Sequence, residues 1–291
     1  MNNFLANVEK IFETLKQFET NINLKNQIRK PKLSDLELIA VDLTAEYMSI
    51  DSERQLFRVL PQEISSRIER SVYNKRRRAL FYEKHRLQQL MAEHITGNET
   101  YYLIDSMPLE ICKLSRASRS KICKENEQTF PDKGYCASQS MYYYGYKLHA
   151  TCSVTGVFKS FDLSSACVHD IHYLKDIKHL LKSCVIIGDK GYLSADYQLD
   201  LFTSNKIQLE IPMRSNQHQY KAYPAVFKKS RKRIETLFSQ LCDQFMIRRN
   251  YAKTFNGFKT RILSKITSLT VIQLINKLLN RNINNLKIGI A

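Results

Sequence analysis

The sequence lacks the patterns that mark secreted, membrane-spanning and zinc-binding proteins. Its seven cysteines include no Cys-x-x-Cys pair and no zinc-ribbon spacing. No run reaches the ~18 apolar residues of a membrane span, and Glu9 and Glu13 interrupt the N-terminal stretch where a signal peptide would be apolar. We find no internal repeat and no low-complexity segment. We therefore expect reduced thiols, no membrane partner and a cytoplasmic location.

Acidic residues are also scarce. The 291 residues contain 45 Lys and Arg against 28 Asp and Glu, a formal net charge of +17, while 43% hydrophobic residues suffice for a buried core. Such a charge attracts polyanions, and double-stranded DNA is the first partner to consider. A lysine-rich solvated surface is the alternative. The clustering of charge disfavours this alternative, because the Lys and Arg residues gather at 67–86 and 228–233.

The first 95 residues have helical periodicity. Apolar residues recur at spacings of three and four over residues 2–26, so this helix packs on the core or on a second copy in a homodimer. Capping signals predict helices over 34–47 and from 51 or 52 to 61, and a basic third helix covers 67–90. This outline fits a helix-turn-helix, although many helical bundles share it. The predicted DNA contacts are Arg70, Lys75, Arg76, Arg77 and Arg78.

Residues 96–291 change to a strand pattern. Strands are predicted at 101–104, 143–152, 157–165, 185–187 and 207–211, with crossover helices at 171–183 and 194–204. A polar loop at 214–224, a basic amphipathic helix and an apolar helix over about 259–280 follow. We therefore expect an all-α N-terminal region, 1–95, and an α/β domain, 96–291, with an RNase H-like mixed five-stranded sheet flanked by helices.

Three acids have settings typical of metal ligands. Asp105 and Asp189 each follow an apolar strand, and Glu235 lies within the basic helix. In the RNase H-like order the first and fourth strands are neighbours, so the three carboxylates would meet. Carboxylates suit Mg²⁺ or Mn²⁺, and two such ions can act together on a phosphodiester.

Each of these acids also has a purely structural interpretation. Asp105 could form a turn, Asp189 could cap a helix before Gly191, and Glu235 could pair with Arg231 one helical turn away.

Two other clusters give weaker signals. Cys167, His169 and His172 could be imagined as a soft-metal site, and His169 with Asp170 as a hydrolase dyad, but neither has the distant ligands that such sites need. Asp170 is predicted to cap the helix that starts at Ile171, with a supporting role near the metals as the alternative.

The sequence resembles the DDE transposases of bacterial insertion sequences over nearly its whole length, most closely the insertion-sequence 982 family. The shared motifs are Tyr102-Leu103-Ile104-Asp105-Ser106, Gly145-Tyr146-Lys147-Leu148-His149, Ile187-Gly188-Asp189-Lys190-Gly191-Tyr192 and Arg231-Lys232-Arg233-Ile234-Glu235. The resemblance implies a catalytic triad of Asp105, Asp189 and Glu235 that holds two divalent cations. It also implies cleavage of the element's terminal inverted repeats and their joining to target DNA. Because two element ends must be held together, we expect a homodimer. Lys190, Arg231, Lys232 and Arg233, basic residues next to Asp189 and Glu235, are predicted to contact the DNA.

The sequence departs from some related families at two positions. They place Tyr three residues before the Arg and Lys seven after the Glu of the last motif, where this chain has Lys228 and Cys242. The DNA-end handling attributed to that Tyr and Lys is therefore not carried over. Two rival functions stay open: a metal-dependent nuclease without strand transfer, and a non-catalytic DNA-binding regulator.

Overall fold

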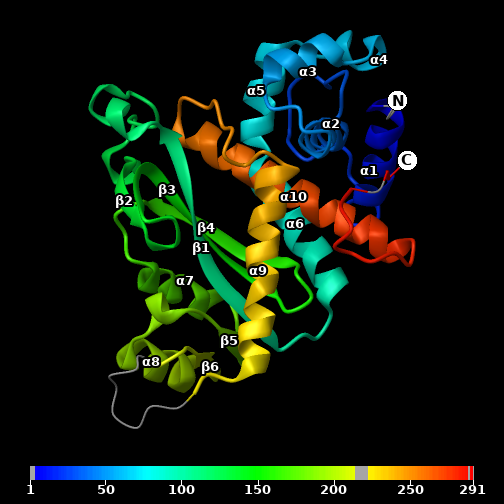
Figure 1. Ribbon diagram of the computed structural model, residues 1–291. Helices are drawn as coiled ribbons and strands as arrows, with labels where there is room; N and C mark the ends of the chain where they lie inside the picture. Colours follow the sequence, from blue (N-terminus) through cyan, green and yellow to red (C-terminus); the bar gives the residue numbers. More distant parts are fainter. Residues whose placement is uncertain (1–3, 214–221, 288, 291) are drawn as a thin grey trace. The chain divides into compact units, whose positions relative to one another are not determined.

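A computed structural model describes residues 4–213, 222–287 and 289–290, and the chain divides into two compact units. The helical unit comprises residues 1–95 and 240–291, and the sheet unit comprises residues 96–239 (Figure 1). The first segment of the helical unit ends at Ile95. The C-terminal helix, expected to accompany the sheet, groups instead with the N-terminal helices.

The helical unit has helices where capping signals predicted them. Both halves of the predicted capping box form at α2, since Glu37 N donates to Ser34 and Ser34 N donates to Glu37. Ser52 caps α3. The helices are α1 (Phe4–Lys16), α2 (Asp35–Tyr47), α3 (Glu53–Val59), α4 (Gln62–Ser65), α5 (Arg70–Ala79), α6 (Phe81–Thr96) and α10 (Phe255–Leu278).

Two predicted helices differ in extent. The first was expected over residues 2–26, of which 2 and 3 lie outside the described residues, but it ends at Lys16. Side chains there bond to nearby backbone, with Asn21 N donating to Glu19 and Asn23 N donating to Asn21, and such bonds compete with helix. The basic segment 67–90, expected as one helix, forms α5 and α6 with a break at Leu80.

A charge cluster is buried inside the helical unit. Asp42 accepts hydrogen bonds from Lys84 and from Ser264 (2.7 Å) and pairs with Arg77 at 3.3 Å. Burial opposes ionisation, but Lys84 and Arg77 hold the pKa of Asp42 well below its usual range. One turn along α2, Glu46 pairs with cations of α10. We call this set the buried charge cluster: Asp42, Glu46, Arg77, Lys84, Arg261 and Lys265.

The described residues of the sheet unit form six strands, one more than expected. Their order is β2-β3-β1-β5-β6, with β4 also paired to β3. The additional strand is the short β2, whose sequence Asp-Lys-Gly-Tyr-Cys carries little strand signal. The strands are β1 (Tyr101–Cys112), β2 (Asp132–Cys136), β3 (Met141–Ser153), β4 (Phe158–Ser165), β5 (Cys184–Ile187) and β6 (Ile207–Glu210). The mixed sheet flanked by helices confirms the predicted RNase H-like α/β class.

The long strand β3 organises one half of this sheet. It pairs antiparallel with β1 along one side, while β2 and then β4 occupy its other side. Gly145 lies where the partner changes, opposite a bulge in β1, and a Cβ there would lie 2.1 Å from the Leu109 carbonyl oxygen. The predicted hairpin of β3 and β4 is confirmed.

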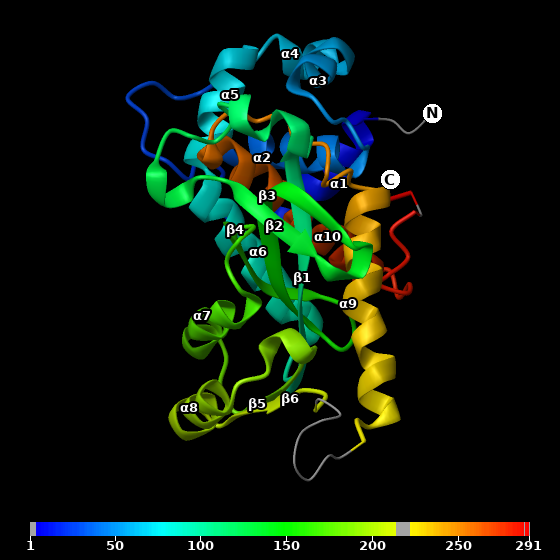
Figure 2. The same ribbon diagram turned by 60° about the vertical axis from the view of Figure 1, so that its left-hand side comes forward.

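Helices α7 (Tyr173–Leu180) and α8 (Ala195–Asn205) lie beside β5 and β6 in both views (Figures 1 and 2). Tyr102 and Ile104 of β1 and Ile186 of β5 face them in one apolar core. Helix α9 (Ala225–Asp243) packs on β4 through Phe238, whose ring centroid lies 6.5 Å from that of Phe158. The polar loop predicted at 214–224 lies mostly outside the described residues. No described helix is long and apolar enough to cross a bilayer.

Candidate active site

Asp105 lies within a strand and does not end it, because β1 continues to Cys112. The shorter β5 pairs with β1 only from Tyr101 to Leu103, so Asp105 lies just beyond the end of its neighbour. Side chains alternate along a strand. Since Tyr102 and Ile104 face α7 and α8, Asp105 points to the other face.

Asp189 occupies the matching place after β5. Ile187 is paired with Leu103 in a parallel register, so Asp189 and Asp105 each stand two residues beyond this pair. The expected meeting of the first and fourth strands is therefore confirmed. Gly191 N donates to Asp189 Oδ1 at 2.7 Å, which starts a short 3₁₀ helix, Lys190–Tyr192. The capping role weighed as an alternative for Asp189 is thus real, and it uses one of the two carboxylate oxygens.

Helix α9 brings Glu235 and Arg231 into the electrostatic surroundings of Asp105. Arg231 Nη2 lies 4.0 Å from Asp105 Oδ2, and Glu235 is exposed one turn further along α9. Burial raises the pKa of Asp105 to about 7. The charges of Asp189 and Glu235 raise it too, whereas the Ser106 N–H and Arg231 lower it. Two of the three predicted acids, Asp189 and Glu235, therefore act on the carboxyl group of the third, Asp105.

The donor chemistry fits a divalent cation. Asp105 is largely buried, with 19% of its side chain exposed, and has two acids and one distant guanidinium as charged neighbours. Hard carboxylate oxygens whose negative charge is only partly offset, here by Arg231, suit Mg²⁺ or Mn²⁺. Within the described ranges, no three His, Cys, Asp or Glu side chains already stand at ligand spacing. Cation binding would therefore have to draw these acids together.

A fourth carboxylate, Asp170, lies beside this group. Its Oδ1 accepts hydrogen bonds from Ser106 Oγ at 3.1 Å and Lys147 Nζ at 2.9 Å. A Cβ on Gly191 would lie 3.0 Å from Asp189 Oδ1 and 3.4 Å from Asp170 Oδ2, so glycine leaves room for both acids. Asp170 was predicted to cap the helix here, but the cap is His169, whose Nδ1 accepts a hydrogen bond from Ile171 N.

Lys147 and His149, quoted above only as parts of a motif, both contact Asp170. Lys147 also donates to the Val168 carbonyl at 2.7 Å. His149 Nδ1 lies 3.9 Å from Asp170 Oδ1, while its Nε2 bonds Ser164 Oγ at 2.8 Å. Burial lowers the pKa of His149 to about 4, so the ring is neutral at pH 7. The alternation of β3 could have placed Lys147 and His149 on one face, but not opposite Asp170.

Two contacts fix the turn that carries Asp189. A Cβ on Gly188 would lie 2.8 Å from both Ile104 and Ile211, so a larger residue would displace the turn. Tyr223 OH donates to the Glu210 carbonyl at 3.2 Å and lies 3.5 Å from the Gly188 carbonyl oxygen. These contacts join the chain just before α9 to the strands that lead to Asp189.

The basic residues predicted to contact DNA differ in their exposure. Arg70, Lys75 and Arg78 are exposed on α5, and Lys190 and Lys232 are exposed in the sheet unit. Arg76 instead pairs with buried Asp35 at 2.7 Å, and Arg77 is buried with Asp42 and Glu53. Arg233 is half-buried. The basic run thus combines surface residues with residues that hold the unit together.

The imagined soft-metal cluster finds no support in the described part of the chain. Cys167, His169 and His172 are exposed and form no metal-binding group. His169 uses its ring as the cap described above.

Comparison with known proteins agrees with the geometry. Residues 97–271, more than half of the chain, match the family described as the transposase DDE domain. Neither the curated proteins nor the solved structures gave a match. The matched range includes Asp105, Asp189 and Glu235. The chain therefore belongs to the transposase DDE domain family, whose members act on DNA, cleave nucleic acid and use divalent metal ions.

Proposed function

We propose that this protein is the transposase of a bacterial insertion sequence. It binds the terminal inverted repeats of its element, cleaves a phosphodiester there and joins the freed end to target DNA. Asp105, Asp189 and Glu235 are the catalytic and metal-binding residues. The observation that carries the proposal is the parallel register of β1 and β5, in which Asp105 and Asp189 each stand two residues beyond a paired position, with Asp105 4.0 Å from Arg231 of α9.

Each residue has a distinct task. Asp105, Asp189 and Glu235 would hold two Mg²⁺ or Mn²⁺ ions, which when bound activate water and stabilise charge on the phosphate. Asp105 is kept from solvent by burial and oriented by the Ser106 N–H. Arg231, 4.0 Å from Asp105, is placed to attract the negatively charged DNA strand. Lys190 and Lys232 are exposed beside the acids and bind flanking phosphates, with half-buried Arg233 supporting them.

The helical unit supplies most of the DNA affinity. Residues 34–90 form the helix-turn-helix region, and the exposed side of α5, with Arg70, Lys75 and Arg78, contacts the duplex. Two element ends must be held together, so the protein acts as a homodimer on DNA in the bacterial cytoplasm. We further propose that it is most similar to the insertion-sequence 982 family, a proposal supported by its four sequence motifs, although Lys228 and Cys242 depart from related families.

The test is a strand-transfer assay. Purified protein is incubated with labelled duplex containing the DNA that flanks its coding sequence, together with a target plasmid, in Mg²⁺ or in EDTA. We expect joined product in Mg²⁺ with wild type, and none in EDTA or with Asp189→Asn. Asp176→Asn is the matched control, because Asp176 is exposed on α7 away from these acids.

The rival functions give different products. Cleavage without joining would identify a nuclease, and binding that ignores both Mg²⁺ and the acid substitutions would identify a regulator. The raised pKa of Asp105 favours an enzyme, because a buried carboxylate among other acids is costly unless a cation uses it.

A further inference from the structure

The helical unit contains a cavity of about 590 Å³ that the proposed catalytic site does not use. Its walls come from the start of α3, from α5, from residues 251–254 and from the first turns of α10. Segments near both ends of the chain therefore build one pocket.

The rim of this pocket is basic. Arg54, Arg70, Arg78 and Lys253 line it with exposed side chains. Across the described ranges, none of the four forms an ion pair, although Arg78 donates to the Asn74 carbonyl at 3.4 Å. Four unneutralised cations around one opening create a positive potential that attracts anions.

The floor adds positive charge from the buried charge cluster. Arg77 and Arg261 line the pocket, and each has about 5% of its side chain exposed. The cluster's four cations face Asp42 and Glu46, and Glu53 joins through Arg77 at 3.2 Å. Burial lowers the pKa of Lys84 and of Lys265, so the two arginines are the lasting positive charges of the floor. Among the described residues the Nε atoms of Arg77 and Arg261 have no hydrogen-bond partner. Buried guanidinium groups with an unused donor favour an anion nearby.

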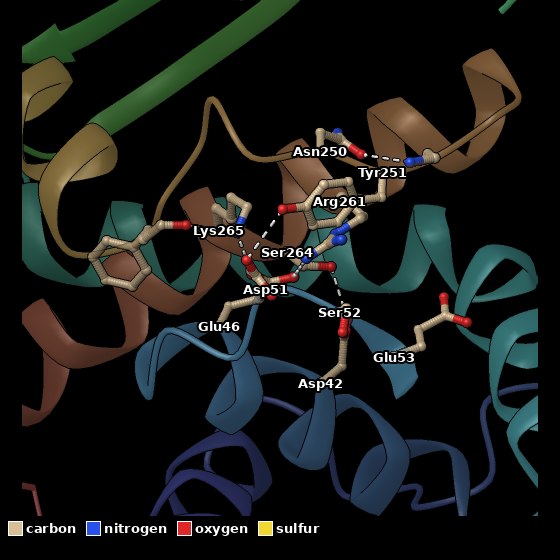
Figure 3. A network of polar contacts seen from close by, with 12 residues as sticks. Asp42, Glu46, Asp51, Ser52, Glu53, Asn250, Tyr251, Arg261, Ser264 and Lys265 are labelled. Carbon is tan, nitrogen blue, oxygen red and sulfur yellow. Dashed lines mark hydrogen bonds and ion pairs between the residues drawn. The ribbon is translucent and has the colours of Figure 1, made fainter. Parts of the chain in front are cut away.

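The C-terminal wall is held in place before any ligand arrives. Figure 3 shows Asn250 and Tyr251 near Arg261, with the acids of α2 on the other side of the network. Asn250 accepts a hydrogen bond from Ala252 N at 3.2 Å and donates to the Phe258 carbonyl at 3.1 Å, while Tyr251 OH donates to Asp51 at 3.4 Å. Thr254 caps α10, whose first turn has no acidic residue, so the positive end of the helix dipole also faces this region.

We propose that this pocket binds backbone phosphates of duplex DNA, with Arg54, Arg70 and Lys253 as the direct contacts. The proposal rests on the proposed function for the presence of DNA, and it adds the C-terminal segment to a surface otherwise assigned to residues 34–90. The lining favours phosphate over base recognition, because six of its thirteen residues are Arg or Lys. Its amide and its carboxylate, Asn74 and Glu53, are hydrogen-bonded to each other. Arg77 and Arg261, at the floor of the pocket, attract the phosphate through their positive charge without contacting it.

The test measures DNA binding by the full-length protein in EDTA, where no strand is cut. Fluorescence anisotropy with a labelled duplex gives Kd over a series of salt concentrations for wild type, Arg54→Gln and Lys253→Gln. Removing one interaction with a phosphate lowers the slope of log Kd against log salt by about 0.9. We expect that decrease in each variant, with several-fold weaker binding to flanking and random duplexes alike. Arg29→Gln, at an exposed position outside the pocket, removes the same charge and serves as control.

Three results would overturn the proposal. If Arg54→Gln and Lys253→Gln keep the wild-type slope of log Kd against log salt, as the control Arg29→Gln should, then the rim does not bind phosphate. A loss of affinity confined to the flanking duplex would indicate base reading. Equal weakening by all three variants would indicate net charge alone. Thermal melts verify folding, and if Arg54→Gln melts early, the loop variant Lys253→Gln decides. Wild type that binds through the pocket but joins no DNA would count against the proposed function only.

Discussion

The two units both bury aspartates, and they treat them in opposite ways. In the helical unit, Asp42 is surrounded by Lys84, Arg77 and Ser264, and its pKa is well below the usual range. In the sheet unit, burial and two neighbouring acids raise the pKa of Asp105 to about 7. A carboxylate neutralised by its own chain stabilises the fold. A carboxylate left among acids destabilises the unliganded protein and is suited to a cation from outside.

The largest effect should come from a change at the uncompensated acids. Asp189→Asn keeps the size of the side chain but removes a ligand charge, so strand chemistry should fall by more than about 100-fold, equivalent to several kcal/mol. DNA binding in EDTA should be nearly unchanged. A single-turnover cleavage assay and an anisotropy titration measure the two properties, and cleavage within tenfold of wild type would contradict the assignment.

The compensated acid should matter for stability instead. Asp42→Asn leaves Lys84 and Arg77 buried without their main partner, and it should lower the free energy of unfolding by about 3–5 kcal/mol. Urea denaturation at pH 7 gives this number. Asp200→Asn, at an exposed pair with Lys178, is the control and should shift the midpoint little. An equally small shift for Asp42→Asn would mean that the buried charge cluster does not hold the unit together.

Substitution of Asp105, whose pKa is raised, should stabilise the protein. The folded pKa of Asp105 is raised, so between about pH 4 and 7 the folded state binds more protons than the unfolded state and stability falls as pH rises. Asp105→Asn removes that penalty. In EDTA the variant should be more stable than wild type by about 3 kcal/mol at pH 8. At pH 5 this difference in stability should be smaller by roughly 2 kcal/mol. Denaturation at both pH values checks the sign, and a destabilised variant at pH 8 would refute it.

The smallest effect concerns the guanidinium near Asp105. Arg231 is partly exposed and 4.0 Å away, so Arg231→Gln should cost about 0.5 kcal/mol of stability in EDTA at pH 8. In the background of Asp105→Asn the same change should cost nothing, because its partner charge is gone. A double-mutant cycle measures the difference, and equal costs in both backgrounds would show that Arg231 and Asp105 do not interact.

The sequence identified the elements whose signals are local. Ser34 and Glu37 lie within one turn and their capping box formed as predicted. Asp105 and Asp189 were predicted as metal ligands because each follows an apolar run typical of a buried strand. Their adjacency followed from strand order, which is a property of topology and not of individual side chains.

Features that depend on distant partners were missed. Arg77 and Lys84 belong to a basic run that looks solvent-exposed in sequence, and only the fold brings Asp42, at least 35 residues away, between them. The contacts of Asp170 with Ser106 and Lys147 likewise join separate elements. Strand β2 is short and polar, so its pairing with β3 supplies the structure that its own residues do not favour.

The discontinuous make-up of the helical unit also has a consequence for protein synthesis. Residues 96–239 separate its two parts, and a ribosome that adds about 5–20 residues per second needs roughly 7–30 s to translate them. During that interval Asp42 and Glu46 have been made but Arg261, Ser264 and Lys265 have not. A chain interrupted after Ser239 would carry all three proposed catalytic acids yet lack residues 251–261, which line the proposed phosphate-binding pocket. That pocket is therefore completed only when the last part of the chain has been made.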